Sequence, residues 1–154
     1  MNAPDPLPKT LRVVIDGEVF VGELHPDAPR TVAAFVGLLP YAQKLIHVRW
    51  SGEACWVPMG DFELGVGFEN HTSHPSAGDV LFYPGGYSET ELLIAYGACG
   101  FASRMGPLAG NHFLTLPGAR ERLRTIGQRV LWHGAVEVRF ERDDAAPSIP
   151  EQTP

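Results

Sequence analysis

Residues 11–24, LRVVIDGEVFVGEL, decide the fold predicted for this chain. Two runs rich in β-branched and aromatic residues flank Asp16-Gly17. Asp-Gly between such runs is the strongest short-range hairpin signal, because both turn positions need a positive φ. The stretch therefore predicts two antiparallel strands, 11–15 and 19–24, joined by a tight turn.

Runs of β-forming residues between turn signals recur along the rest of the chain. They predict strands over 45–50, 53–57, 78–84, 91–96, 111–116 and 130–141. Helically spaced apolar residues predict one helix over 29–39, ended by Pro40, and a second over 118–126, ended by Gly127. About eight strands in a chain of 154 residues favour a mainly β protein with a single closed barrel and two capping helices, and a β-sandwich is the alternative.

The predicted domain organisation is simple. The barrel domain spans 11–141, between a flexible N-terminal tail, 1–10, and a flexible C-terminal tail, 142–154, both rich in Pro, Asp, Ser and Ala. The formal net charge of −6 argues against a nucleic-acid partner, and the longest apolar stretch, 92–102, is too short to cross a membrane. Two widely separated cysteines predict free thiols and a cytoplasmic location. Homo-oligomerisation stays open.

Several segments resemble cyclophilins. Residues 21–35, VGELHPDAPRTVAAF, resemble the second strand and first helix of that family, and 47–50, HVRW, resemble the strand with the catalytic arginine. Residues 78–86, GDVLFYPGG, and 92–97, LLIAYG, resemble bacterial cyclophilin-like proteins of unknown function. The resemblance implies a cyclophilin-like barrel with a pocket at Arg49.

The pocket residues depart from the cyclophilin pattern. The aromatic, methionine and glutamine that hold proline in cyclophilins are absent from 50–56, WSGEACW, which contains Glu53. Matching strand by strand places the cyclophilin pocket glutamine and phenylalanine near Glu91 and Leu93, and the pocket histidine near His112. A rival alignment sets 110–114, GNHFL, against the cyclophilin Gly-Ser-Gln-Phe-Phe stretch instead.

These observations favour a small-molecule ligand, an acid or an amide-containing compound, over a peptidyl-prolyl isomerase, which is the alternative. The predicted ligand-binding residues are Arg49, Glu53, Tyr83, Glu91, Tyr96, Asn111 and His112. A planar guanidinium can hold a carboxylate or carbonyl through two parallel hydrogen bonds. Strand alternation would aim Arg49 into the barrel mouth, with Glu53 or Glu91 as its partner, and place Trp50 on the opposite face. Alternatively, Trp50 lines the pocket together with Tyr83, Tyr96 and Phe101. Whether a reaction follows binding stays open.

Metal binding is a further alternative. His71 and His74 have a ligand-like spacing, but Pro75 and the adjacent Ser and Thr indicate a loop. Gly78, Pro84 and Gly86 fit the second cupin motif with Glu89 in the ligand position, yet the chain lacks the His-x-His pair of the first motif. We therefore expect no metal and no cofactor, with a cupin-like metal-binding barrel as the alternative.

The altered pocket predicts weak prolyl-isomerase activity. In a protease-coupled assay on short proline peptides, we expect kcat/KM below ~10⁴ M⁻¹s⁻¹, the low end for enzymes acting on their own substrates. A higher value would restore the isomerase alternative.

Overall fold

The predicted hairpin is present in the computed structural model, which describes residues 6–143. Strands β1 (Thr10–Ile15) and β2 (Glu18–Leu24) pair antiparallel. Asp16 and Gly17 between them have φ angles of 51° and 82°, the left-handed conformation that this turn requires.

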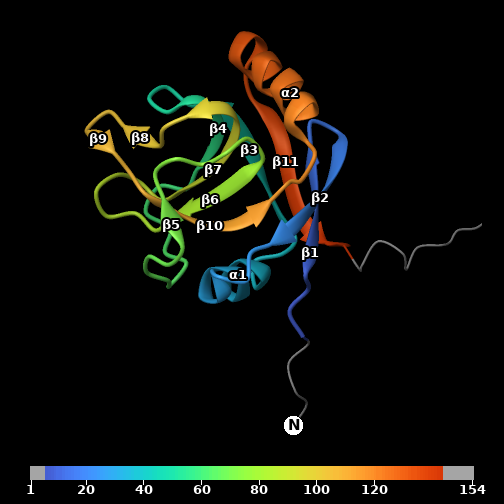
Figure 1. Cartoon of the computed structure of the whole chain (residues 1–154), viewed down its shortest axis with the longest axis vertical. Helices are drawn as coiled ribbons and strands as arrows, with labels where there is room; N and C mark the ends of the chain where they lie inside the picture. Colours follow the sequence, from blue (N-terminus) through green and yellow to red (C-terminus); the bar gives the residue numbers. More distant parts are fainter. Residues whose placement is uncertain (1–5, 144–154) are drawn as a thin grey trace, which may run out of the picture.

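Six further strands continue the sheet until it closes on itself (Figure 1). They are β3 (Tyr41–His47), β4 (Gly52–Pro58), β6 (Asp79–Tyr83), β7 (Glu91–Cys99), β10 (Gly110–Thr115) and β11 (Val136–Arg142). The order is β2-β1-β11-β3-β4-β7-β6-β10, and β10 pairs with β2 to complete the barrel. The short β5 (His71–Thr72) adds to β10, while β8 (Ala102–Ser103) and β9 (Gly106–Pro107) form a separate ribbon. The closed, mainly β barrel is confirmed, and the sandwich is excluded.

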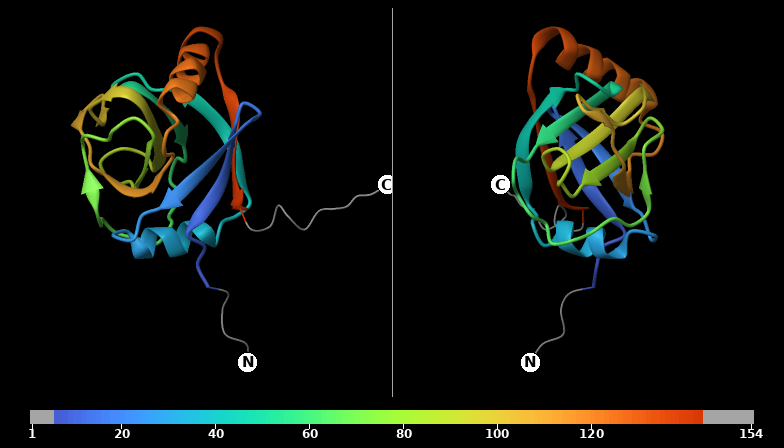
Figure 2. Two further views of the ribbon diagram at one scale, coloured as in Figure 1. Left: turned by 45° about the vertical axis from the view of Figure 1, so that its right-hand side comes forward. Right: turned by 90° about the vertical axis from the view of Figure 1, so that its left-hand side faces the viewer.

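Helices α1 (Pro29–Val36) and α2 (Arg120–His133) lie at opposite ends of the barrel (Figures 1 and 2). The core that they cover receives buried side chains from all eight barrel strands. Phe35 of α1 packs against Phe113 and Phe140, with ring centroids 5.0 and 5.2 Å apart. Burying a side chain of this size stabilises the fold by roughly 1.5–3 kcal/mol.

Several predicted boundaries are wrong. The helix predicted over 29–39 ends at Val36, and the strand predicted over 130–141 begins only at Val136, because α2 extends to His133. Helix α2 continues through Gly127 instead of ending there, because this glycine is an interior packing position: a Cβ on it would lie 2.4 Å from the ring of Tyr96. The strand predicted over 45–50 begins earlier, at Tyr41, and ends at His47. Arg49 and Trp50 therefore lie in a bend, where strand alternation no longer sets their direction.

The two predicted tails fall largely outside the described residues, which exclude 1–5 and 144–154. Within the described part, Thr10 already belongs to β1 and Arg142 ends β11.

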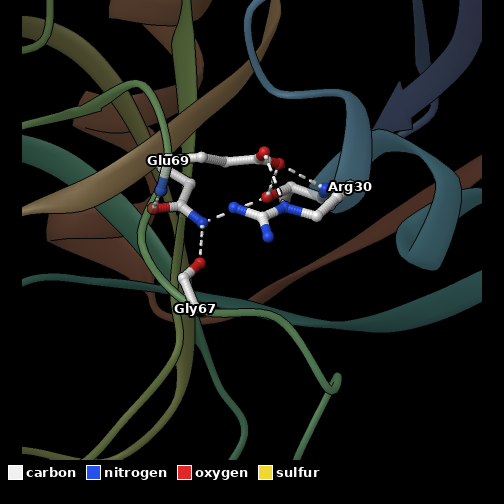
Figure 3. A network of polar contacts seen from close by, with 5 residues as sticks. Arg30, Gly67 and Glu69 are labelled. Carbon is white, nitrogen blue, oxygen red and sulfur yellow. Dashed lines mark hydrogen bonds and ion pairs between the residues drawn. The ribbon is translucent and has the colours of Figure 1, made fainter.

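A polar network joins α1 to the segment before β5 (Figure 3). Ala28 at the start of α1 offers no capping side chain, and Glu69 replaces it by accepting hydrogen bonds from the Thr31 N–H (2.6 Å) and hydroxyl (2.7 Å). The fully buried Asn111 donates to Thr31 Oγ1 and to the Gly67 carbonyl, and accepts from the Glu69 N–H. Burial alone would raise the pKa of Glu69, but the hydrogen bonds from Thr31 and the nearby Arg30 outweigh it and lower the pKa.

Removing this cap should destabilise the protein. We expect Glu69→Ala to lower the free energy of unfolding by about 1–2 kcal/mol in urea titrations, as for loss of other helix caps. The loss should shrink as the pH falls through the lowered pKa of Glu69, where wild type also loses the carboxylate. Glu63→Ala is the matched control, since Glu63 is exposed on the same segment; an equal loss in both variants would contradict the capping role.

Candidate functional site

Strands β6 and β7 are buried on both faces. Val80, Phe82, Leu92 and Ile94 face the barrel core. The residues that alternate with them, Leu81, Tyr83 and Leu93, point to the outside of the barrel. There they form a second apolar cluster with Ala54, Phe101 and Leu108. Phe101 and Leu108 come from the chain excursion between β7 and β10, so this excursion covers the outer face.

A cavity of about 350 Å³ lies beside this cover. Its walls come from the end of β3, the loop that joins β6 to β7, and the β8–β9 ribbon. The volume falls within the range of about 300–1,000 Å³ that is usual for small-molecule sites. Its lining includes the charged residues Arg49, Glu89, Glu91 and Arg104, and Trp50 and Trp56 supply apolar surface.

Glu91 is the unusual group in this cavity. It begins β7 on the outer face and is only 6% exposed, and its side chain forms no hydrogen bond or ion pair with another residue in 6–143. Burial, assisted by the charge of Glu89, raises the pKa of Glu91 to about 8. At neutral pH the side chain is therefore mostly a carboxylic acid, which can donate a hydrogen bond.

Two arginines border the same cavity from different segments. Arg49 lies in the bend after β3, and Arg104 lies in the turn of the β8–β9 ribbon. Hydrogen bonds from Ser51 Oγ to the Ala102 carbonyl (3.1 Å) and from the Ala102 N–H to Ser51 Oγ (3.0 Å) tie the bend to the ribbon. Both guanidinium groups are exposed, and neither forms an ion pair within the described chain.

Of the other predicted site residues, two lie close to this region without lining the cavity. The Tyr83 hydroxyl accepts hydrogen bonds from the Tyr87 and Ser88 N–H groups (3.1 and 3.2 Å), so it holds the loop that forms one wall. Glu53 accepts a hydrogen bond from the Ala98 N–H (2.8 Å). Glu53 is therefore not the partner of Arg49 that the sequence suggested.

The remaining three predicted residues lie elsewhere. Tyr96 faces the barrel core, with its hydroxyl 2.7 Å from His47 Nε2, so Tyr83 and Tyr96 occupy opposite faces of the wall. Asn111 belongs to the α1 network. The structure does not bring His112 to the Arg49 cavity.

His112 contacts an acid and a hydroxyl through a single ring nitrogen. Its Nε2 lies 2.7 Å from Thr115 Oγ1 and 3.3 Å from Asp79 Oδ1. Burial would raise the pKa of Asp79, but hydrogen bonds from His112 and Ser76 outweigh it and lower the pKa. A hydroxyl–His–Asp relay uses both ring nitrogens, so this set is not arranged as one.

Two expectations about the Arg49 segment are corrected. The site lies on the outside of the barrel wall and not in the barrel mouth. Trp50 is 56% exposed and lines the same cavity as Arg49, because β3 ends before either residue. Sequence reasoning also missed Trp56, Arg104, Tyr87 and Met105. The only sequence signal for Arg104 and Met105 is the Ser-Arg-Met-Gly turn at 103–106, which does not reveal what it packs against.

The metal alternatives find no geometric support in the part of the chain that the structure describes. There, no group of three or more His, Cys, Asp or Glu side chains is placed to hold a metal ion. A Glu89 oxygen accepts a hydrogen bond from the Gly60 N–H (2.9 Å), and His71 lies in β5 against the ring of Phe68. Among residues 6–143, no helix has the length and apolar character needed to cross a bilayer.

Comparison with known families gives a match over residues 16–142 to one described as "Protein of unknown function (DUF3830)". This chain belongs to that family. No curated protein matches the chain. The solved "Structure of McbB in complex with tryptophan" resembles this DUF3830 protein with a TM-score of 0.65 and 17% identity. The alignment covers 93% of this chain and 46% of McbB, so the DUF3830 chain spans about half of McbB.

At that identity, the likeness to McbB shows a shared fold alone. Neither description names cyclophilins, so the cyclophilin-like assignment stays a prediction.

The raised pKa of Glu91 predicts how the stability of the protein depends on pH. In unfolded chains Glu91 loses its proton near pH 4.5, whereas the folded protein keeps it to about pH 8. Because the folded state binds more protons in this window, wild-type stability should fall as the pH rises. Glu91→Gln should therefore match wild type below pH 4.5 and exceed it by up to about 4 kcal/mol at pH 8.

The measurement is a series of urea titrations between pH 4 and pH 9, with the exposed Glu63→Gln as control. If the difference in unfolding free energy between Glu91→Gln and wild type does not change with pH, the pKa of Glu91 is not raised by folding, and the side chain is ionised in the folded protein.

Proposed function

We propose that this protein binds a small acid or amide-containing compound in the cavity bordered by Arg49, Glu91 and Arg104. The observation that carries the proposal is Glu91, a nearly buried acid that lines the cavity and whose side chain has no hydrogen-bond or ion-pair partner among the described residues. A protonated carboxyl in this position can donate a hydrogen bond to a ligand oxygen that enters the cavity.

The two arginines favour the same kind of ligand. Guanidinium groups bind carboxylate and carbonyl oxygens through charge-assisted hydrogen bonds, and both arginines lack an ion pair within residues 6–143. Acids and amides carry oxygens that can accept from Arg49 and from a protonated Glu91 alike. McbB, which shares the fold, is described as a complex with tryptophan, a small molecule that carries a carboxylate, and this favours a small ligand for the present protein as well.

We place the protein among the bacterial cyclophilin-like barrels and in the cytoplasm. The eight-stranded barrel with a helix at each end supports the first assignment, and α2 follows β10 as the sequence alignment to cyclophilins requires. The free thiols of Cys55 and Cys99 favour a reducing compartment. Prolyl isomerisation remains the less favoured activity, because the position aligned with the cyclophilin glutamine is the acid Glu91.

A thermal-shift screen of small acids and amides tests the binding site. We expect Arg49→Ala to weaken binding of any stabilising compound by about 1.5–3 kcal/mol, the usual contribution of a charge-assisted hydrogen bond. Arg120→Ala is the matched control, since Arg120 is an exposed arginine on α2. His112→Ala should also leave binding unchanged, because His112 does not line the cavity.

The proposal fails if a compound that stabilises wild type stabilises Arg49→Ala to the same extent. It also fails if His112→Ala abolishes binding while Arg49→Ala does not.

A further inference from the structure

We infer that the ligand is an aromatic monocarboxylate whose ring packs among Trp50, Trp56, Tyr87 and Met105 while Arg49 and Arg104 hold its carboxylate. This inference rests on the proposed function and narrows its ligand class. Two independent observations support it: the apolar side chains that line the cavity, and the net charge of the ionisable side chains in the same lining, which we call the rim.

The apolar walls are exposed to an unusual degree. Trp50, Tyr87 and Met105 are 56%, 56% and 60% exposed, and all three line this one cavity together with the less exposed Trp56. Single exposed apolar side chains need no explanation, but a group of large ones around a cavity marks a binding surface. Aromatic rings gain about 0.5–1.5 kcal/mol from pairing beyond the burial of their area, and a thioether adds a favourable contact with a ring.

The walls are joined across the cavity. The Tyr87 hydroxyl donates a hydrogen bond to the Met105 carbonyl (3.0 Å), which links the β6–β7 loop to the β8–β9 ribbon. The Met105 N–H in turn donates to Ser103 Oγ (3.0 Å). These bonds, with those from the Tyr87 and Ser88 N–H groups to Tyr83, hold the Tyr87 side chain and the Met105 backbone in place before a ligand arrives.

The charge of the rim matches a single carboxylate. Arg49 and Arg104 are the cationic side chains in the lining, Glu89 is an anionic one, and His47 lies at the end of β3 with its Nε2 on the Tyr96 hydroxyl. With Glu91 protonated, the lining carries one net positive charge. A ligand with two carboxylates would leave the occupied cavity with a net negative charge, because its lining has no cationic side chain besides the two arginines.

The size of the cavity agrees with this class. About 350 Å³ corresponds to roughly a dozen water volumes, which is enough for one ring with a short acidic chain.

Isothermal titration with matched compounds tests the inference. The probes are 3-phenylpropanoate and indole-3-acetate, each compared with its amide, and 3-phenylpropanoate also with 3-cyclohexylpropanoate and with the dianion phenylsuccinate. We expect an aromatic acid to bind at least fivefold more tightly than its cyclohexyl counterpart, and at least tenfold more tightly than its amide or the dianion, as one ring contact and one charge-assisted contact predict.

Tryptophan variants locate the ring. The chain has three tryptophans. Trp50→Ala should remove the preference for aromatic over cyclohexyl acids, whereas Trp132→Ala, at a 75% exposed position on α2, should leave it intact. Both side chains are exposed, so neither variant should unfold, and unchanged urea titrations confirm this.

The outcomes separate the inference from the proposed function. Equal binding of the cyclohexyl and phenyl acids, or tighter binding of the amides, would overturn the aromatic carboxylate and leave the acid-or-amide site standing. Failure of every acid and amide to bind more tightly than roughly 10 mM would overturn both. Aromatic selectivity that survives Trp50→Ala would place the ring elsewhere.

Discussion

The burial of β6 and β7 on both faces is the constraint on which the candidate site depends. One set of alternate side chains fills the barrel, and the other set, which includes Leu81 and Leu93, would face water without a cover. The excursion between β7 and β10 supplies that cover through Phe101 and Leu108. The excursion also carries the β8–β9 ribbon to the end of β3, and residues of both line the cavity.

The same constraint explains the state of Glu91. Glu91 is in the outer-facing register of β7, two residues before Leu93, so it shares the covered face of the sheet. A charged carboxylate without a partner would be strongly disfavoured there, and the side chain retains its proton instead. The acid thus remains a hydrogen-bond donor beside two arginines, an arrangement that suits an oxygen-rich ligand.

Much of the barrel could be predicted because its signals are local. Asp16-Gly17 specifies a turn by its own conformational preferences, and the spacing of Val32, Phe35 and Val36 identifies the apolar face of α1. Gly127 shows the limit of local reasoning. Only the proximity of Tyr96, distant in sequence, reveals that this glycine permits close packing and does not end a helix.

The site was predictable only in part. Arg49 and Glu91 were identified through a resemblance between strands, and both line the cavity. Arg104 and Tyr87 were missed because they lie in loops whose positions depend on hydrogen bonds between distant segments, such as those between Ser51 and Ala102. His112 was chosen because it aligns with the cyclophilin pocket histidine, but both it and Asn111 make hydrogen bonds away from the cavity.

The protonation state of Glu91 tests the account most directly. The measurement is a carboxyl-carbon NMR titration of protein labelled at glutamate, with the Glu91 resonance assigned from its loss in Glu91→Gln. The account predicts that this carboxyl titrates near pH 8 in the free protein. A Glu91 resonance that titrates near the ordinary value of 4.5 would contradict it, because the cavity would then contain a solvated anion and not a buried hydrogen-bond donor.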